Sequence, residues 1–278
     1  MKLNALLKTL GFLALAATPV VAGTAPAPKN PAPVQPAVND DLGLNLGLGY
    51  HSSYIWRGFN AGQHWVDASL GGTIPLVEGT RLAWDVNYGS LASDQDTISP
   101  FSGLNLSYER LQLGAAIQHD LGPVTASLGF RHFRNMGDYN TLLGLRDGNE
   151  IQLGLATSVG PINLASSANY DISNYSWYFD LDANTSIAVT DSISVVPFVN
   201  IGYGKNFAWQ LSRDSLNPTG WTAFSTGVRV PVKLNSRTTL TPYIAVNSPL
   251  GQLDSTNGLP RNITQPIVFG GVTLSVSF

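Results

Sequence analysis

Histidine is scarce in this chain, which limits the acid–base chemistry that the protein could perform. The four histidines among its 278 residues are His51, His64, His119 and His132. His51 and Ser53 are two residues apart, and on a strand this spacing puts both side chains on one face, where an imidazole can activate a hydroxyl. Asp180 and Asp182 share a face in the same way, as a pair of acid–base carboxyl groups would. The sequence does not tell which histidine, if any, lies beside these two acids.

Other catalytic and ligand-binding patterns are absent from the sequence. The chain has no cysteine, which excludes disulfides, thiolate metal sites and a lipid anchor on an N-terminal cysteine. It also has no phosphate-binding glycine loop, zinc signature or nucleophile elbow. We therefore expect a protein that is not an enzyme, with no metal and no cofactor.

Strands must position these side chains, because apolar and small polar residues alternate with a period of two from Leu42 onward. The pattern predicts an all-β protein of twelve strands, at 42–57, 65–76, 80–91, 101–120, 123–134, 149–160, 161–172, 176–189, 192–204, 221–234, 238–248 and 266–278. In the fourth strand the apolar positions change from even to odd between Tyr108 and Leu111. We interpret this change as a β-bulge, whereas a tight turn there would give thirteen strands, and a count of fourteen also stays open.

Composition and connection lengths indicate which solvent these strands face. Only 12% of the residues are charged although 44% are hydrophobic, and the polar faces carry mainly Gly, Ser, Asn, Thr and Asp. A soluble barrel would show Lys and Glu to water. Long connections at 58–64, 92–100, 135–148, 173–175, 205–220 and 249–265 alternate with connections of a few residues. This alternation predicts a transmembrane antiparallel up-and-down β-barrel in a bacterial outer membrane, with long external loops.

The two ends of the chain fit this location. Residues 1–22 have two lysines followed by an apolar run too short to cross a membrane, and they predict a cleaved signal peptide. Residues 23–40 are rich in Pro and Ala and predict a periplasmic tail, so the barrel would span 41–278. The last strand alternates up to a terminal aromatic, with the apolar positions Leu274, Val276 and Phe278. We expect the barrel-assembly machinery to recognise this C-terminal signal.

The parity of each strand predicts which charged side chains line the lumen. Eight acids and five bases point inward, which favours a mild preference for cations: Asp67, Asp85, Glu109, Asp120, Glu150, Asp171, Asp180 and Asp182, with Arg57, Arg81, Arg131, Arg229 and Lys233. The alternative is that these charges pair with one another and fill a narrow barrel. Many inward Gly, Ala and Ser residues favour a narrow pore over a filled interior.

Aromatic residues gather near the strand ends that meet the long connections, where the lipid headgroups would lie. The predicted lipid-interface aromatics are Tyr54, Trp56, Tyr88, Phe130, Tyr170, Trp177, Phe179, Tyr203 and Trp221. A formal net charge of −5 after removal of the first 22 residues, with 13 basic and 18 acidic residues left, gives no reason to expect nucleic-acid binding.

The first hairpin, with Tyr54-Ile55-Trp56-Arg57-Gly58 ending the first strand and a small polar loop leading to Val66, resembles the TorF-type porin family of bacterial outer-membrane barrels. The resemblance extends over about residues 42–135. It implies a small porin-like barrel, with Arg57 as a lumen-facing residue close to the external mouth. Pairing of Arg57 with a neighbouring carboxylate would fix the first loop, and this structural role is an equal alternative.

Together these observations predict a channel for passive diffusion of small polar solutes, with outer-membrane lipid around it and its oligomeric state open. A non-conducting structural or adhesion barrel that acts through its external loops is the competing class. A third class is the outer-membrane lipid hydrolase, which uses a His-x-Ser spacing. Two observations count against it: parity turns His51 and Ser53 away from lipid, and Tyr54-Ile55 stands where those enzymes have Asn-Gly.

Overall fold

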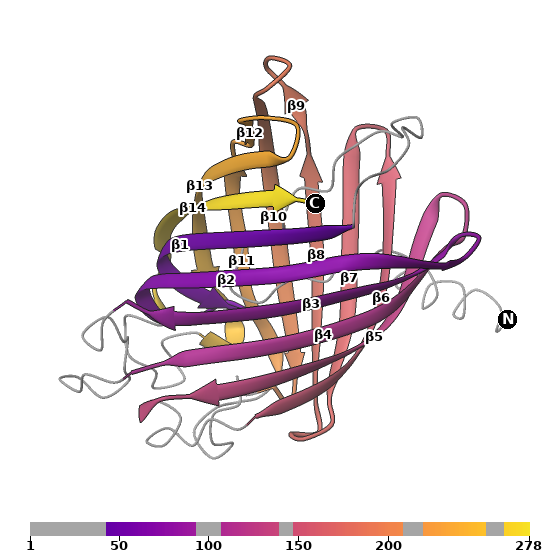
Figure 1. Cartoon of the computed structure of the whole chain (residues 1–278). Helices are drawn as coiled ribbons and strands as arrows, with labels where there is room; N and C mark the ends of the chain where they lie inside the picture. The colour runs from indigo at the N-terminus through magenta and orange to yellow at the C-terminus, as the bar shows by residue number, and fades with distance from the viewer. Residues whose placement is uncertain (1–42, 93–106, 139–146, 208–218, 254–263) are drawn as a thin grey trace, which may run out of the picture.

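The computed structural model describes residues 43–92, 107–138, 147–207, 219–253 and 264–278, and these form one closed antiparallel β-barrel (Figure 1). The strands are β1 (Leu44–Trp56), β2 (Phe59–Val77), β3 (Thr80–Leu91), β4 (Glu109–Asp120), β5 (Val124–Met136), β6 (Gly148–Val159), β7 (Ile162–Asp171), β8 (Ser176–Thr185), β9 (Ile187–Ala188), β10 (Ser194–Lys205), β11 (Gly220–Arg229), β12 (Val232–Lys233), β13 (Thr238–Pro249) and β14 (Ile267–Ser277). A short 3-10 helix, η3 (Gly251–Leu253), follows β13.

Twelve strands make up the wall, because β9 and β12 are two-residue continuations of β8 and β11. Val230 and Pro231 separate β11 from β12, and a proline interrupts the ladder because it has no N–H to donate. The sheet closes where the last strand pairs with the first, from Asn45 opposite Ser277 to His51 opposite Gly271. The predicted strand count and the predicted up-and-down barrel are confirmed.

Two predicted details are wrong. No bulge interrupts β4, which pairs with β3 in one regular register from Glu109 to His119; residues 101–106 lie outside the described residues. The predicted loop at 58–64 is also wrong, because β2 already begins at Phe59 and only Arg57 and Gly58 separate it from β1. Both turn residues have positive φ, of 51° and 86°, as the two-residue type I′ hairpin turn requires.

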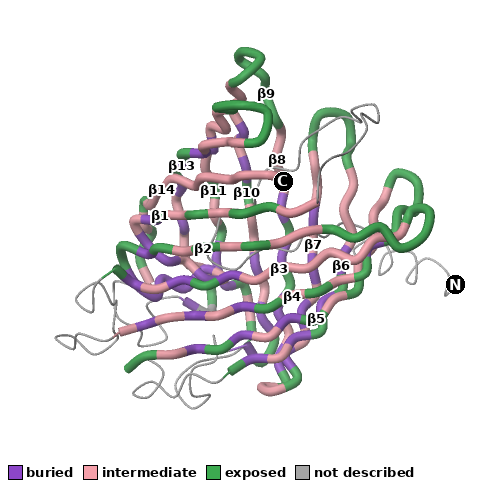
Figure 2. Tube along the Cα trace, viewed as in Figure 1, coloured by how far each residue is buried: buried purple, intermediate pink, exposed green. Residues whose placement is uncertain are grey.

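Connections at the two ends of the barrel differ in length. We call the end with the short connections after β2, β4, β6, β9 and β12 the turn end, and the opposite end the loop end. Buried stretches gather in the halves of the strands nearest the loop end, and the turns at the other end are exposed (Figure 2). The barrel interior is therefore most densely filled near the loop end.

The distribution of polar and apolar side chains is the inverse of that in a soluble protein. Buried side chains include His51, Gln112 and Glu150, whereas Leu128 and Ile244 are more than half exposed on the outer wall. An exposed apolar surface that surrounds a closed sheet requires a lipid solvent. The alternation read from the sequence thus places hydrocarbon outside and polar groups inside.

Residues 1–42 lie outside the described residues, so the signal peptide and the periplasmic tail stay predictions. Within the described ranges, no helix is long and apolar enough to cross a membrane.

Candidate functional site

The tip of the first hairpin folds into the loop end of the barrel. We call residues 56–62 the hairpin tip: Trp56, Phe59, Asn60 and Ala61 are each at most 5% exposed, and Gly58 and Gly62 are buried as well. The register shifts between Tyr54 and Ile55, where β2 carries one extra residue. A bulge of this kind sharpens the local twist and bends a hairpin. The bend explains why this hairpin leaves the wall and enters the interior.

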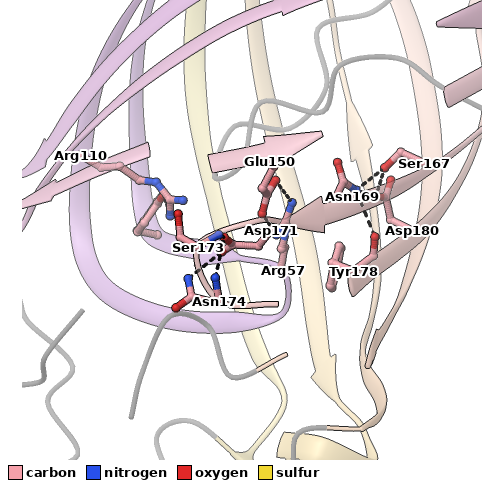
Figure 3. A network of polar contacts seen from close by, with 11 residues as sticks. Arg57, Arg110, Glu150, Ser167, Asn169, Asp171, Ser173, Asn174, Tyr178 and Asp180 are labelled. Carbon is pink, nitrogen blue, oxygen red and sulfur yellow. Dashed lines mark hydrogen bonds and ion pairs between the residues drawn. The ribbon is translucent and has the colours of Figure 1, made fainter. Parts of the chain in front are cut away.

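Arg57 carries the contact of the hairpin tip with the opposite wall. Its two terminal guanidinium nitrogens donate to the two carboxylate oxygens of Glu150 on β6 at 2.6 and 2.7 Å (Figure 3). The two side chains are 8% and 1% exposed. The guanidinium carbon also lies 4.4 Å from the ring centre of Tyr178 on β8. A planar, bidentate, largely desolvated pair is the strongest form of such a contact.

The turn residue beside Arg57 contacts the strands on the other side. A Cβ built on Gly58 would lie 2.3 Å from the Cβ of Ala223 on β11, so only glycine fits there. Asn247 on β13 donates its side-chain amide to the carbonyl of Gly58 at 2.9 Å. The hairpin tip thus touches β6 and β8 through Arg57, and β11 and β13 through Gly58. It crosses the interior from one side to the other.

Aromatic and cationic groups surround the start of the hairpin tip. The Arg110 guanidinium on β4 lies 3.9 Å from the ring centre of Trp56 and 4.2 Å from that of Phe133 on β5. Phe207, after β10, meets Trp56 edge-on at 5.9 Å between ring centres. These contacts combine apolar burial with cation–π attraction.

Carboxylates line the interior beside the hairpin tip. Asp180 on β8 accepts hydrogen bonds from Ser167 and Asn169 on β7 (Figure 3). Asp182, the next inward position, accepts from Asn200 on β10 at 3.1 Å. One oxygen of each carboxylate has no hydrogen-bond partner, and both residues are at least 91% buried. These acids bring two carboxyl groups into the interior on the side of the Arg57–Glu150 pair.

Asp171 has a structural role at the loop end. Its carboxylate accepts hydrogen bonds from the backbone N–H groups of Ser173 and Asn174, in the turn between β7 and β8, and from the side-chain amide of Asn174. This is an Asx-type turn, and it fixes the connection that carries Tyr175 at a φ of 53°.

His51 belongs to a polar network that runs along the wall. Its Nδ1 lies 2.8 Å from the hydroxyl of Tyr243 on β13, and its Nε2 lies 3.4 Å from a carboxylate oxygen of Asp67 on β2. Both ring nitrogens therefore have partners other than Ser53, which lies two residues along the chain and is also buried. The geometry is a third observation against a nucleophile pair of His51 and Ser53. The hydrogen bonds of His64, His119 and His132 run to Tyr50, Thr80 and Asn149, so none of them serves Asp180 or Asp182.

Most of the predicted lumen charges lie on the inner side of the wall. Those buried or largely buried there are Arg57, Asp67, Asp85, Arg131, Glu150, Asp171, Asp180, Asp182 and Arg229. Arg81 and Asp120 lie instead at the rim of the turn end, where they form an exposed ion pair of 2.9 Å. Lys233 in β12 is exposed at the same end, where it pairs with Thr239 on the inward face of β13.

Glu109 is placed wrongly by the sequence pattern. It accepts a hydrogen bond of 2.7 Å from the hydroxyl of Tyr88, which is 43% exposed on the outer face. Arg110 takes the inward position and is 3% exposed. The predicted bulge caused this error, because it shifted the parity by one residue. Extending the alternation of Leu111 and Leu113 backward along β4 would have pointed Arg110 inward.

Two of the predicted lipid-interface aromatics are inside the barrel. Tyr54 is 1% exposed and stacks on the inward Trp65 with ring centres 4.0 Å apart, and Trp56 is 4% exposed. The inward course of the hairpin explains the difference: Ser53 and Tyr54 are consecutive and both buried, so both faces of this part of β1 lie inside the barrel. Gly89 makes room for this stack, because a Cβ there would lie 2.3 Å from the Trp65 ring.

The other predicted aromatics lie on the outer face. Five of them form a continuous row of ring contacts from β7 to β11, with centres 4.7 to 6.4 Å apart: Tyr170, Trp177, Phe179, Tyr203 and Trp221. Tyr88 and Phe130 are exposed on other strands of the same surface. The row lies near the loop end, where an aromatic girdle would meet the headgroups.

The C-terminal residues belong to the strand that closes the barrel. Leu274 and Val276 on β14 pair with Leu48 and Leu46 of β1, and the backbone N–H of Phe278 donates to the carbonyl of Leu44 at 2.9 Å. Within the described ranges, no group of three or more potential ligand side chains could hold a metal ion.

Comparison with known proteins extends this description. No family model and no curated protein sequence matches the chain. Among solved structures, an outer-membrane channel from Pseudomonas putida F1 has a TM-score of 0.57 at 12% identity, over 88% of this chain and all of that one. The translocator domain of the autotransporter NalP from Neisseria meningitidis has a TM-score of 0.50 at 12% identity, over 87% and 90%. This chain has the fold of bacterial outer-membrane barrels.

A third similar structure is the KdgM porin, with a TM-score of 0.48 at 9% identity, over 84% of this chain and 99% of that one. The apolar outer wall, the row of aromatics and the fold place this barrel in the bacterial outer membrane. Identities this low show the barrel fold and leave membership of the TorF-type family as a prediction.

Proposed function

We propose that this protein is a porin-like channel through which small polar solutes diffuse across the outer membrane. The observation that carries the proposal is a closed barrel with an apolar outer wall and an interior lined by charged and amide side chains. The turn-end half of the lumen is lined by small residues, such as Gly114, Ala116 and Ser127, which leave space for water.

The charges of the lumen support a mild preference for cations. Among the described residues, six acids line the interior, Asp67, Asp85, Glu150, Asp171, Asp180 and Asp182, against four arginines, Arg57, Arg110, Arg131 and Arg229. This set differs from the predicted one in that Arg110 takes the place of Glu109, and the exposed rim residues Arg81, Asp120 and Lys233 are left out. The interior then has an excess of two acids. Fixed charge of one sign raises the concentration of counter-ions in a narrow pore.

Conductance in planar lipid bilayers tests the proposal. We expect refolded protein to give small unitary currents, and a potassium chloride gradient to give a reversal potential of the sign that cation preference requires. Bilayers that stay sealed at every voltage would overturn the channel. A strong anion preference would overturn the assigned selectivity and leave the channel itself intact.

One observation favours a second candidate, a non-conducting barrel that acts through its external loops. The hairpin tip fills part of the interior at the loop end, and the side chains around it are almost completely buried. In that case liposomes that contain the protein would not swell when they are placed in solutions of small sugars. Intact cells would lose adhesion when the external loops are exchanged for those of another barrel. We place the channel first because the opposite half of the lumen is lined by small residues.

The proposal includes the surroundings, the export and the family of the barrel. Outer-membrane lipid surrounds the wall, the assembly machinery reads the C-terminal strand, and the signal peptide directs export. Membership of the TorF-type porin family is supported by the sequence of the first hairpin and by the inward position of Arg57. The mass of the purified protein in detergent distinguishes a monomer from a homo-oligomer.

A further inference from the structure

The hairpin tip is anchored on opposite sides of the lumen by two different kinds of contact. On one side Arg57 meets Glu150 through two charge-assisted hydrogen bonds, and on the other Gly58 packs against Ala223 and accepts from Asn247. A strand pair tied at one end only would project along the barrel axis. Here the crossing contacts hold the tip across the path that a solute must follow.

The base of the hairpin has the features of a bending point. From Leu44 to His51 the pairing with β2 is regular, and the shift comes only between Tyr54 and Ile55. Beyond the shift, Ile55 and Trp56 pair with Asn60 and Phe59, so the tip is a short ladder joined to the wall through the bulge. A bulge leaves one residue outside the ladder, and the backbone there has fewer hydrogen bonds to hold its direction.

Several polar atoms of the tip are buried without hydrogen-bond partners. They are both side-chain amide atoms of Asn60 and the indole nitrogen of Trp56, and Nε and Nη2 of the neighbouring Arg110 are in the same condition. A permanent core would pair such atoms, since each buried polar group without a partner costs free energy. The inward position of the tip therefore carries a free-energy cost, as do several side chains of the surrounding wall. The Arg57–Glu150 pair offsets that cost.

We propose that the Arg57–Glu150 ion pair is the specificity-determining contact of the channel, because it holds the hairpin tip across the lumen and so sets the size of solute that passes. This inference rests on the proposed channel function. With the pair formed, solutes cross only through the space left beside the hairpin tip. With the pair broken, the hairpin turns about its bulge and the lumen widens toward its full diameter.

The first test compares variants of the pair by single-channel conductance. Arg57→Ala and Glu150→Gln should each raise the unitary conductance severalfold, and the exchange of charges in Arg57→Glu with Glu150→Arg should bring it back toward the wild-type value. Arg237→Ala removes a positive charge from an exposed turn at the opposite end and should leave conductance unchanged. Heat-modifiable migration in gels establishes whether each variant is folded. If Arg57→Ala does not fold, Glu150→Gln still tests the pair, because it preserves the volume of the side chain.

The largest solute that passes the channel is a second measurement, and it would not change if the ion pair only stabilised the fold. In liposome swelling with sugars of increasing mass, the Arg57→Ala channel should admit sugars that the wild type excludes. An unchanged size limit and an unchanged conductance in both single variants would overturn the inference.

A cross-link provides a test in the opposite direction. The chain has no cysteine, so Arg57→Cys with Glu150→Cys gives a unique pair of thiols at the two positions of the ion pair. Before cross-linking, this double variant should conduct more than the wild type, as Arg57→Ala does. Bridging the two thiols with a short, reducible bismaleimide should lock the hairpin tip and remove the gain of conductance, and reduction of the linker should bring it back. If the bridged and the reduced proteins conduct equally, the hairpin tip does not control passage.

The two proposals fail in distinguishable ways. Conducting wild-type protein with unaltered variants overturns the role of the ion pair alone. A sealed wild type with conducting Arg57→Ala supports the ion pair and overturns constitutive diffusion. Bilayers that stay sealed with every folded variant overturn the channel and the ion-pair inference together.

Discussion

His51 on β1 and Tyr243 on β13 meet across the intervening strand β14, with 2.8 Å between Nδ1 and the hydroxyl oxygen. Both residues stand opposite Gly271 in the pairing, His51 from one side and Tyr243 from the other. A Cβ on Gly271 would lie 2.8 Å from the Tyr243 ring and 2.3 Å from the carbonyl oxygen of Tyr50. The missing side chain lets the contact close over the seam where the first and last strands join.

Gly271→Ala should therefore weaken the seam. The added methyl group meets the backbone of Tyr50, which cannot move without disturbing the pairing of β1 with β14. Overpacking of this kind costs about 1–3 kcal/mol in the free energy of unfolding. Urea unfolding in detergent or lipid measures it. Gly251→Ala, where a Cβ would make only ordinary contacts, is the control, and equal stabilities of the two variants would contradict the prediction.

Tyr243→Phe should cost less, because it removes one hydroxyl and leaves the ring in place. Loss of one buried hydrogen bond lowers stability by about 0.5–1.5 kcal/mol. A double-mutant cycle with His51→Gln isolates the contact, and the coupling energy should be favourable. If the two changes add without coupling, the bond does not stabilise the closed barrel.

Neutralising the inner acids should shift ion selectivity. Asp180→Asn with Asp182→Asn removes both carboxyl groups and the negative charge that this pair carries, so the reversal potential in a salt gradient should move toward anion preference. Glu109→Gln is a matched control, since that carboxylate faces outward beside Tyr88. The prediction fails if the control shifts the reversal potential as much as the double variant does.

Tryptophan fluorescence should separate the two faces of the wall. In single-tryptophan variants, brominated lipids should quench Trp177 and Trp221, which lie in the outer aromatic row, and should leave Trp56 and Trp65 nearly unquenched. The quencher acts by contact within the bilayer, and the inner pair is shielded by the sheet. If Trp56 were quenched as strongly as Trp221, Trp56 would have to face the lipid, and the prediction would be wrong.

Removing Phe278 should impair assembly in cells more than folding in detergent. Its backbone N–H makes one hydrogen bond to Leu44 at the closing seam, while its side chain is 41% exposed and adds little packing. A truncated chain should therefore refold in vitro and accumulate less in the outer membrane. Equal amounts of the two proteins in isolated outer membranes would show that the residue is no assembly signal.

The register of alternation made the sheet predictable from the sequence. The acids Glu150, Asp171 and Asp180, on β6, β7 and β8, could be assigned to the inner face from the sequence. Each of these strands is uninterrupted, and a period of two then fixes the face of every side chain on it. Parity fails wherever a residue is inserted, since a single bulge turns all later side chains to the other face. Parity also fails where a hairpin leaves the wall: both faces of the first hairpin lie inside the barrel, so Tyr54 and Trp56 are buried although their parity predicted lipid. The bulge assumed in the fourth strand hid the inward position of Arg110.

The sequence by itself determined the solvent of each face, because alternation is local and each residue carries its own share of hydrophobic or polar character. Only the tertiary structure decided where the first hairpin goes. Arg57 and Glu150 are 93 positions apart and become neighbours when the barrel closes and a bulge bends the hairpin inward. Contacts across a lumen depend on curvature, stagger and closure, which are properties of the whole sheet.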